Sequence, residues 1–302
     1  MRIASMLSSA TEIVYALGLQ DHLVGISHEC DWPPQALRLP RLSRSRFDPA
    51  GLGSGQIDAE VRRCMLEFGS VYEVDVQALR EARPDVILTQ AVCEVCAVPT
   101  GSVDAAVAEL PWRPAVVSLD AHSLEGIFRT MHQVADAAGE SGRGEEAVAR
   151  LRDRVDRVRE VVASRRRPRV LALEWLDPPF APGHWVPEMV EIAGGDNLVG
   201  TAGSHSREIP WAQAEGLDPD RLLLVPCGYA MDRARQDADE SRARLRCLAA
   251  AAIDAGRAAV GDSAYFSRSG PRVVEGIEAL AAWLHPDAGL PPPDGRILQG
   301  WR

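Results

Sequence analysis

Two cysteines separated by two residues follow a short apolar run in the first third of the chain. The run is Val86-Ile87-Leu88, and Cys93 and Cys96 come shortly after it. Thiolates at this spacing bind zinc or iron–sulfur clusters, or form a redox dithiol. A redox pair usually opens a helix, whereas Pro99 follows this pair closely, so we favour metal binding over redox chemistry. The simpler alternative is a pair of half-buried thiols beside a loop.

Two more cysteines follow apolar runs in the same way. Cys30 comes after a run in the first half, and Cys227 after a run in the second half. Ligands of open parallel sheets bind beyond the carboxyl ends of the strands. We therefore expect Cys30 and Cys227 to meet Cys93 and Cys96 in one cleft, around zinc or an iron–sulfur cluster. The other candidates for a fourth ligand are His28, Glu29 and an exogenous molecule.

Aromatic residues near predicted loop ends form a second candidate site. His184 and Trp185 follow the first predicted strand of the second half, and Trp32, Tyr265 and Phe266 lie near other loop ends. Large flat side chains can form the apolar wall of a pocket for a planar ligand. The alternative is that Trp185 and Phe266 belong to the hydrophobic core.

The elements that must position these residues alternate between strands and helices. Short apolar runs at 2–7, 23–27, 85–90 and 115–120 predict strands, and helical patterns lie between them. This alternation is typical of βαβ units with a mostly parallel sheet. A second set of apolar runs, after residue 168, predicts a second sheet.

One long helix separates the two sets of strands. Between residues 144 and 165, apolar residues recur every three or four positions, which predicts one buried stripe on a rod of about 33 Å. We therefore predict an α/β fold with two Rossmann-like lobes that contain parallel sheets. The expected parts are a lobe at 1–143, the interlobe helix at 144–167 and a lobe at 168–302. Residues 44–75 do not fit this alternation of strands and helices. Their pattern predicts an inserted helix that begins near Ser54, preceded by a loop that could cover a binding site.

Composition excludes several functions. The 302 residues carry a net charge of −10, which argues against nucleic acid or an anionic membrane as a partner. The chain contains no lysine, which excludes Schiff-base chemistry and the phosphate-binding Gly-Lys-Ser/Thr loop. No apolar run is long enough to span a bilayer. Polar residues interrupt the N-terminal segment where a secretory signal would be apolar, so we predict a cytoplasmic location.

Several segments of the sequence also carry a resemblance to a known family. "RIASMLSSATEIVYALGLQDHLVGIS", "DWPP", "RPDVIL", "PPFAPGHWVPEMVEIAGGDNLV", "IPW" and "AYFSRSGPRVVEGIEALAAWL" occur in this order along most of the chain. They resemble the class III periplasmic substrate-binding proteins of ABC importers, in which one rigid helix joins two lobes. Within that class they are most similar to the cobalamin-binding branch.

The resemblance implies a binding protein, and not an enzyme, that captures cobalamin or another corrinoid or metal chelate between its lobes. The residues that match pocket positions are Trp32, His184, Trp185, Tyr265 and Phe266. The alternative is a cysteine-ligated iron–sulfur or zinc protein that acts as an enzyme or sensor on the same fold. A small molecule is the expected partner. Docking to an ABC importer fits poorly with the N-terminal segment described above.

Overall fold

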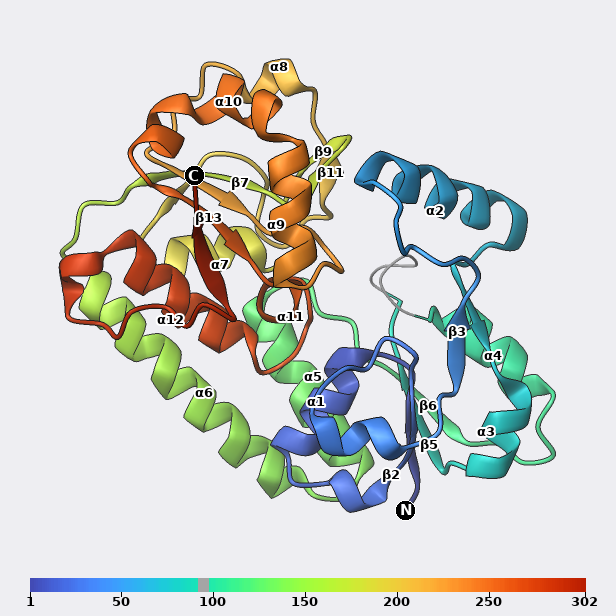
Figure 1. Cartoon of the computed structure of the whole chain (residues 1–302). Helices are drawn as coiled ribbons and strands as arrows, with labels where there is room; N and C mark the ends of the chain where they lie inside the picture. Colours follow the sequence, from blue (N-terminus) through green and yellow to red (C-terminus); the bar gives the residue numbers. More distant parts are fainter. Residues whose placement is uncertain (92–97) are drawn as a thin grey trace.

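The computed structural model describes residues 1–91 and 98–302, which form two α/β lobes (Figure 1). The N-terminal lobe contains a four-stranded parallel sheet in the order β2-β1-β5-β6. Its strands are β1 (Ile3–Ser5), β2 (Leu23–Ile26), β5 (Val86–Thr89) and β6 (Ala115–Ser118). Each strand lies within an apolar run that the sequence assigned to a strand.

The C-terminal lobe contains a separate five-stranded sheet in the order β10-β7-β12-β13-β14. Its strands are β7 (Arg169–Leu173), β10 (Asp196–Asn197), β12 (Arg221–Leu224), β13 (Ala258–Gly261) and β14 (Leu298–Trp301). Only β14 is antiparallel to its neighbour. Since the two sheets are separate, the predicted fold of two lobes with parallel sheets is confirmed.

Two small antiparallel sheets complete the strands. One pairs β3 (Ser43–Ser45) with β4 (Tyr72–Val74), at the two ends of the inserted segment. The other contains β8 (Trp175–Leu176), β9 (Pro179–Ala181) and β11 (Arg207–Glu208).

The long helix α6 (Ser141–Val162) runs along one side of both lobes (Figure 1). Its predicted apolar stripe is buried, namely Val148, Leu151, Val155, Val158 and Val162. The helix begins and ends three residues earlier than the sequence pattern suggested. Gly139, with φ 71°, ends the preceding helix and allows α6 to start at Ser141. The lobe boundaries drawn from the sequence stay predictions.

One cluster of buried apolar side chains extends from α6 into both lobes. It contains Leu88 of β5, Val155 of α6 and Leu223 of β12. Separating the lobes on this side would expose apolar surface to water, at about 25 cal/mol for each Å². The shared core therefore opposes separation of the lobes on this side.

The remaining helices cover the sheets and the inserted segment. In the N-terminal lobe they are α1 (Ser8–Ala16), α2 (Ser54–Phe68), α3 (Val76–Ala82), α4 (Thr100–Ala108) and α5 (Leu124–Ala137). In the C-terminal lobe they are α7 (Val186–Ile192), α8 (Trp211–Ala214), α9 (Met231–Glu240), α10 (Arg242–Asp254), α11 (Ser263–Phe266) and α12 (Val273–Leu284).

The inserted helix α2 begins at Ser54, as the sequence predicted, and it reaches across to the C-terminal lobe (Figure 1). Ile57 is 9% exposed and belongs to the apolar core of that lobe. The Arg233 guanidinium donates a 2.7 Å hydrogen bond to the Leu52 carbonyl, and Arg62 lies 3.4 Å from Glu208. The insertion is therefore a second bridge between the lobes, besides α6.

Candidate functional site

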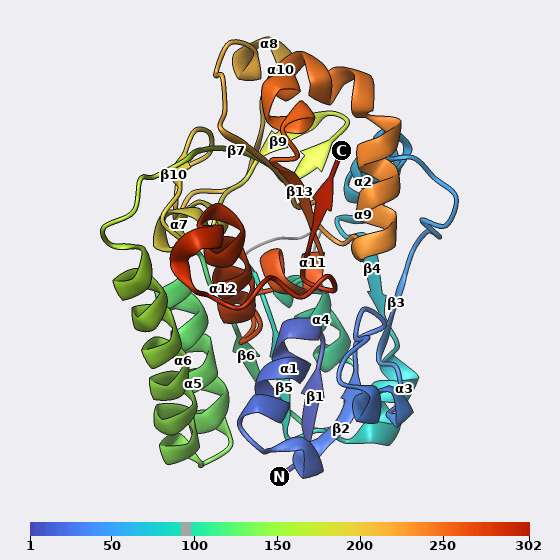
Figure 2. The same cartoon turned by 60° about the vertical axis from the view of Figure 1, so that its left-hand side comes forward.

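The parallel strands of the two sheets point their carboxyl ends toward each other across the space between the lobes (Figures 1 and 2). Residues that directly follow these strands therefore come to the interlobe region from both sides. This is the edge of a parallel sheet where ligands bind. We built the candidate site from these residues.

Three histidines from the two lobes meet in this region. His122 follows β6 in the N-terminal lobe, whereas His184 and His205 lie in loops of the C-terminal lobe. The ring centroid of His122 is 5.4 Å from that of His184 and 5.5 Å from that of His205. The His184 and His205 centroids are 5.2 Å apart. The sequence argument selected only His184, because nothing in the spacing along the chain links it to the other two.

The local backbone explains how His184 and His205 come together. A Cβ atom on Gly183 would lie 2.3 Å from the Ser206 nitrogen, so only glycine allows the two loops to approach so closely. The His184 N–H donates a 2.6 Å hydrogen bond to the Ser204 carbonyl. His184 itself is left-handed, with φ 51°, a conformation in which histidine is enriched.

His184 is a neutral imidazole at pH 7. Burial, assisted by the neighbouring His122 and His205, lowers the pKa of His184 to about 4. Its Nδ1 atom is buried and has no hydrogen-bond partner among the described residues. A neutral ring with a free nitrogen can donate an electron pair to a metal in a bound chelate.

A carboxyl group with a perturbed pKa follows β7. Burial raises the pKa of Glu174 to about 7, although hydrogen bonds from Ser206 and Gly183 act in the opposite direction. The Ser206 hydroxyl donates to Glu174 Oε1 over 2.8 Å, and Ser206 is the chain neighbour of His205. The Cys227 N–H donates to the Glu174 carbonyl over 3.0 Å. Burial therefore favours the protonated form of Glu174, a residue that the sequence analysis did not select.

Two of the predicted aromatic residues come together across the lobes, on either side of an arginine. The Arg272 guanidinium carbon is 4.8 Å from the ring centroid of Trp32 and 4.9 Å from that of Tyr265. Such contacts are cation–π interactions. Trp32 is 39% exposed, so part of its ring is accessible at the rim of the interlobe region.

Arg272 is held by a buried carboxylate of the other lobe. Glu12 of α1 is fully buried, and Arg272 donates two hydrogen bonds to it, one of 2.9 Å from Nε to Oε2. Arg268 lies 3.2 Å from Glu12 and makes two bonds of 2.6 and 2.7 Å to Asp31. Burial raises the pKa of Asp31, but the hydrogen bond and charge of Arg268 outweigh it and hold the pKa below its usual value. These four residues, the Glu12 network, tie the lobes together.

Trp185 and Phe266 lie in the hydrophobic core. Trp185 is 6% exposed and Phe266 is 0% exposed. The Trp185 indole N–H donates a 2.7 Å hydrogen bond to the Phe266 carbonyl, which satisfies the only polar atom of the side chain. Their geometry matches the alternative of core packing, and a part in ligand binding stays a prediction for both.

The predicted cysteine-ligated metal centre finds no support. Cys30 is 1% exposed, its sulfur lies 3.1 Å from the Thr11 hydroxyl, and burial raises the pKa of its thiol. A metal ligand must be a thiolate, which this environment disfavours. Within residues 1–91 and 98–302, no group of three or more His, Cys, Asp or Glu residues could hold a metal ion. Cys93 and Cys96 lie outside the described residues, and Cys227 is half-buried in the other lobe.

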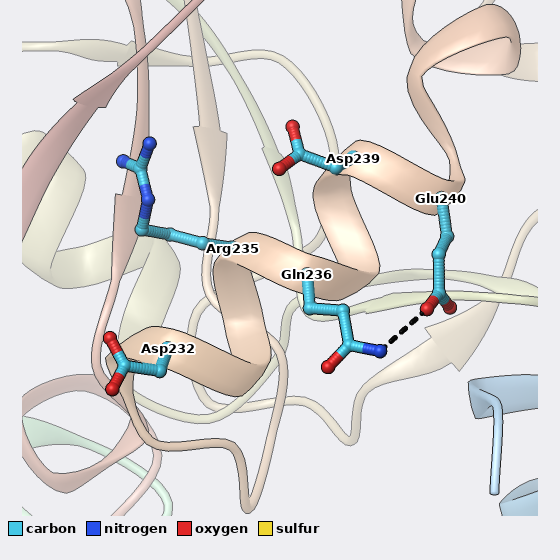
Figure 3. A pocket seen from close by; sticks show the side chains of 5 residues that line it. All are labelled: Asp232, Arg235, Gln236, Asp239 and Glu240. Atoms are coloured by element: carbon cyan, nitrogen blue, oxygen red, sulfur yellow. Dashed lines mark hydrogen bonds between the residues drawn. The ribbon is translucent and has the colours of Figure 1, made fainter. Parts of the chain in front are cut away.

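A hollow of about 510 Å³ lies on one face of α9 (Figure 3). All five side chains that line it come from that single helix, namely Asp232, Arg235, Gln236, Asp239 and Glu240. Gln236 donates to Glu240 over 2.8 Å, and Arg235 donates to the Gly300 carbonyl. Because these groups do not converge on a common point, we assign no ligand to this surface.

Two lobes, one connecting helix and a site between the strand ends define the class of two-lobed binding proteins. The chain belongs to the periplasmic binding protein family, whose model matches residues 3–245. Vitamin B12-binding proteins from three strains of Vibrio cholerae serotype O1 are 23% identical to it over 287 residues. The alignment covers 94% of this chain and 88% of each relative.

Solved structures show the same fold. The periplasmic vitamin B12 binding protein BtuF of Vibrio cholerae superposes with a TM-score of 0.66 at 20% identity, over 94% of this chain and 96% of that one. A periplasmic heme binding protein from Pseudomonas aeruginosa gives a TM-score of 0.73 at 22% identity, over 100% and 98%. At these identities the likeness shows the fold alone.

The comparisons correct the predicted cytoplasmic location, which is wrong. The matched family and the similar structures are periplasmic binding proteins. The polar residues near the N-terminus, from which the location was inferred, belong to β1 and α1, where Ser5, Ser8, Ser9, Thr11 and Glu12 are buried within the fold. Among the described residues, no helix is both long and apolar enough to cross a membrane.

Proposed function

We propose that the protein binds cobalamin or a related corrinoid between its two lobes. The observation that carries the proposal is the group of three histidines, in which His184 is neutral and has a buried, unpartnered Nδ1. A corrinoid macrocycle supplies four nitrogen ligands to cobalt, so one imidazole is enough to complete an axial position. The similarity to vitamin B12-binding proteins along 94% of the chain supports the same ligand class.

The rim of the interlobe region suits a large planar ligand. Trp32 presents part of its ring there, and Arg272 lies between this ring and that of Tyr265 in the other lobe. A flat macrocycle gains from burial of its face against an aromatic ring. Because the shared core and the Glu12 network restrict lobe motion, we propose that ligand entry needs only a small hinge opening. We also propose an ABC importer as the partner, as is usual for binding proteins of this class.

Haem is the second candidate ligand. The same neutral imidazole suits iron in a porphyrin, and the fold matches a heme binding protein with a TM-score of 0.73. A siderophore, which lacks a planar macrocycle, would gain less from the exposed face of Trp32.

Absorbance titrations distinguish these ligands. We expect aquocobalamin to bind with a dissociation constant of about 1 μM or tighter, which corresponds to about −8 kcal/mol. Its axial water exchanges, so coordination by an imidazole should shift its visible bands, whereas cyanocobalamin should bind without a shift. If hemin binds more tightly than aquocobalamin and gives the spectrum of a histidine-ligated haem, the proposed ligand is haem and not a corrinoid. An absence of binding to aquocobalamin, cobinamide and hemin would refute the proposal.

Two matched histidine variants test the site itself. His184→Asn keeps a residue that tolerates the left-handed backbone but removes the imidazole, and it should weaken aquocobalamin binding by about tenfold or more, or about 1.4 kcal/mol. His22→Asn is the control, because His22 contacts the Met1 carbonyl in the N-terminal lobe and lies outside the histidine group. Equal affinities for the two variants would exclude His184 from the site.

A further inference from the structure

A second hollow, of about 260 Å³, lies at the opposite edge of the C-terminal sheet from the interlobe region. Arg165 and Arg166 enter it after α6, Arg221 from the start of β12, and Arg257 from just before β13. These positions are at the amino ends of the strands, whereas the proposed ligand site is at the carboxyl ends. We refer to this hollow as the arginine pocket.

The arginine pocket has an excess of positive charge. Its four arginines face two aspartates, Asp220 and Asp287, which leaves two positive charges without a counterion. The whole protein has the opposite balance, with a net charge of −10. Like charges that share a partly buried space repel each other and cost stability unless an anion compensates them.

One of the two carboxylates in the pocket, that of Asp220, already has hydrogen-bond and ion-pair partners. Asp220 accepts a 2.9 Å hydrogen bond from the Arg169 backbone N–H and a 3.0 Å contact from Arg166. This arrangement leaves Arg221 and Arg257 without a carboxylate partner among the described residues.

Arg221 and Arg257 both line the pocket, and each has one buried donor without a partner in the part of the chain that the structure describes. The Nε atoms of both side chains are buried and have no hydrogen-bond partner among the described residues. A buried guanidinium donor without an acceptor is costly. Burial, together with the charge of Arg257, lowers the pKa of Arg221. The Trp283 ring, 5.6 Å from the Arg221 guanidinium carbon, supports this side chain on one side.

We propose that the arginine pocket binds a phosphate dianion, either inorganic phosphate or a small phosphate monoester. Guanidinium groups match the oxygens of a phosphate in geometry and charge. A dianion would neutralise the two excess positive charges, and the guanidinium groups that line the pocket would donate hydrogen bonds to its oxygens. The volume is below the roughly 300 Å³ at which pockets for drug-sized molecules begin, so only a small ligand fits.

Calorimetric titration at pH 8 and constant ionic strength is the direct test. We expect inorganic phosphate to bind with a dissociation constant of about 1 mM or tighter. Titration with glycerol 3-phosphate distinguishes inorganic phosphate from a phosphate monoester, because a lower dissociation constant for the ester identifies a monoester as the ligand. Binding of citrate without binding of phosphate would overturn the assignment, and so would an absence of heat with both phosphate compounds.

A double variant and a matched control test the residues. Arg221→Gln with Arg257→Gln should weaken phosphate binding by about tenfold or more. The control is Arg63→Gln with Arg44→Gln, which removes the same charge from exposed ion pairs in the N-terminal lobe and should leave phosphate binding unchanged.

A loss of phosphate binding could also arise if the double variant is destabilised. Thermal unfolding in phosphate and in chloride separates this effect from the loss of a binding site. Phosphate should raise the melting temperature of the wild-type protein and of the control, but not that of the double variant. In chloride the double variant should be at least as stable as the wild type, because mutual repulsion is relieved. Equal loss of stability in both salts would mean that the two arginines are structural, and would refute the proposal.

Discussion

Replacing Glu12 by glutamine should weaken the connection between the lobes, because the Glu12 network is buried and joins them. Glu12 is 0% exposed and Arg272 is 8% exposed, so the change leaves a buried guanidinium without its counter-charge. Removing one partner of a buried ion pair costs about 3–5 kcal/mol. Glutamine keeps one oxygen acceptor at the same place, so we expect the lower end, about 3 kcal/mol.

Thermal and urea unfolding measure this loss. With an unfolding entropy of about 2.1 cal/mol/K per residue, 302 residues give a fall in melting temperature of about 5 °C. Asp31→Asn is the control, because Asp31 binds Arg268 in the same network but its side chain is 60% exposed. That variant should cost less than about 1 kcal/mol.

A double-mutant cycle then isolates the pair from the rest of the network. Glu12→Gln and Arg272→Met should be strongly non-additive, since the second substitution removes the charge that the first leaves unpaired. We expect a coupling free energy of about 2 kcal/mol, within the range for residues in one ion-pair network. Additivity within about 0.5 kcal/mol, or a cost of Glu12→Gln no larger than that of Asp31→Asn, would refute the reasoning.

Three other outcomes follow from the same structure. His184 binds a proton more readily in the unfolded chain than in the folded protein, so this residue makes the free energy of unfolding rise with pH between about 4 and 6.5. Glu174 has the opposite effect, because its raised pKa makes the free energy of unfolding fall with pH between 4.5 and about 7. In urea titrations, Glu174→Gln should therefore leave a stability that rises with pH in this range and His184→Asn one that falls; equal slopes would contradict the assignment. Ile57→Ala should cost about 2–4 kcal/mol, because α2 buries this side chain in the core of the other lobe, and Leu66→Ala on the exposed face of the same helix should cost less than about 0.5 kcal/mol in the same denaturation assay. Trp32→Ala should weaken corrinoid binding by about tenfold in absorbance titrations, while Trp112→Ala, whose indole donates to the Pro84 carbonyl in the N-terminal lobe, should not change it.

The sequence could not decide between core and pocket for the aromatic residues. Trp185 and Phe266 are apolar enough for either place, and their neighbours along the chain are the same in both cases. The hydrogen bond from Trp185 to the Phe266 carbonyl joins residues 81 positions apart, and it places both in the core. Trp32 and Tyr265 differ because Arg272, which the sequence argument did not select, holds them at the rim.

The position of a cysteine directly after a strand also did not predict where its side chain lies. Cys30 does follow β2, but the chain turns back so that its thiol packs beside Thr11 in the core. The direction of a side chain in a loop depends on contacts with distant segments, and strand order alone does not supply it.

The amino-acid sequence by itself determined the main parallel strands β1, β2, β5, β6, β7, β12 and β13, the long helix α6 and the two-lobed architecture, because short apolar runs and a helical apolar stripe mark these elements. Val148 to Val162 were assigned to one buried stripe on this ground, and the structure buries them. Only the tertiary structure decided the histidine group, the Glu12 network and the arginine pocket. Each joins segments that are distant along the chain, as far as 260 positions apart for Glu12 and Arg272, so no local period connects them, and they meet only when the chain folds.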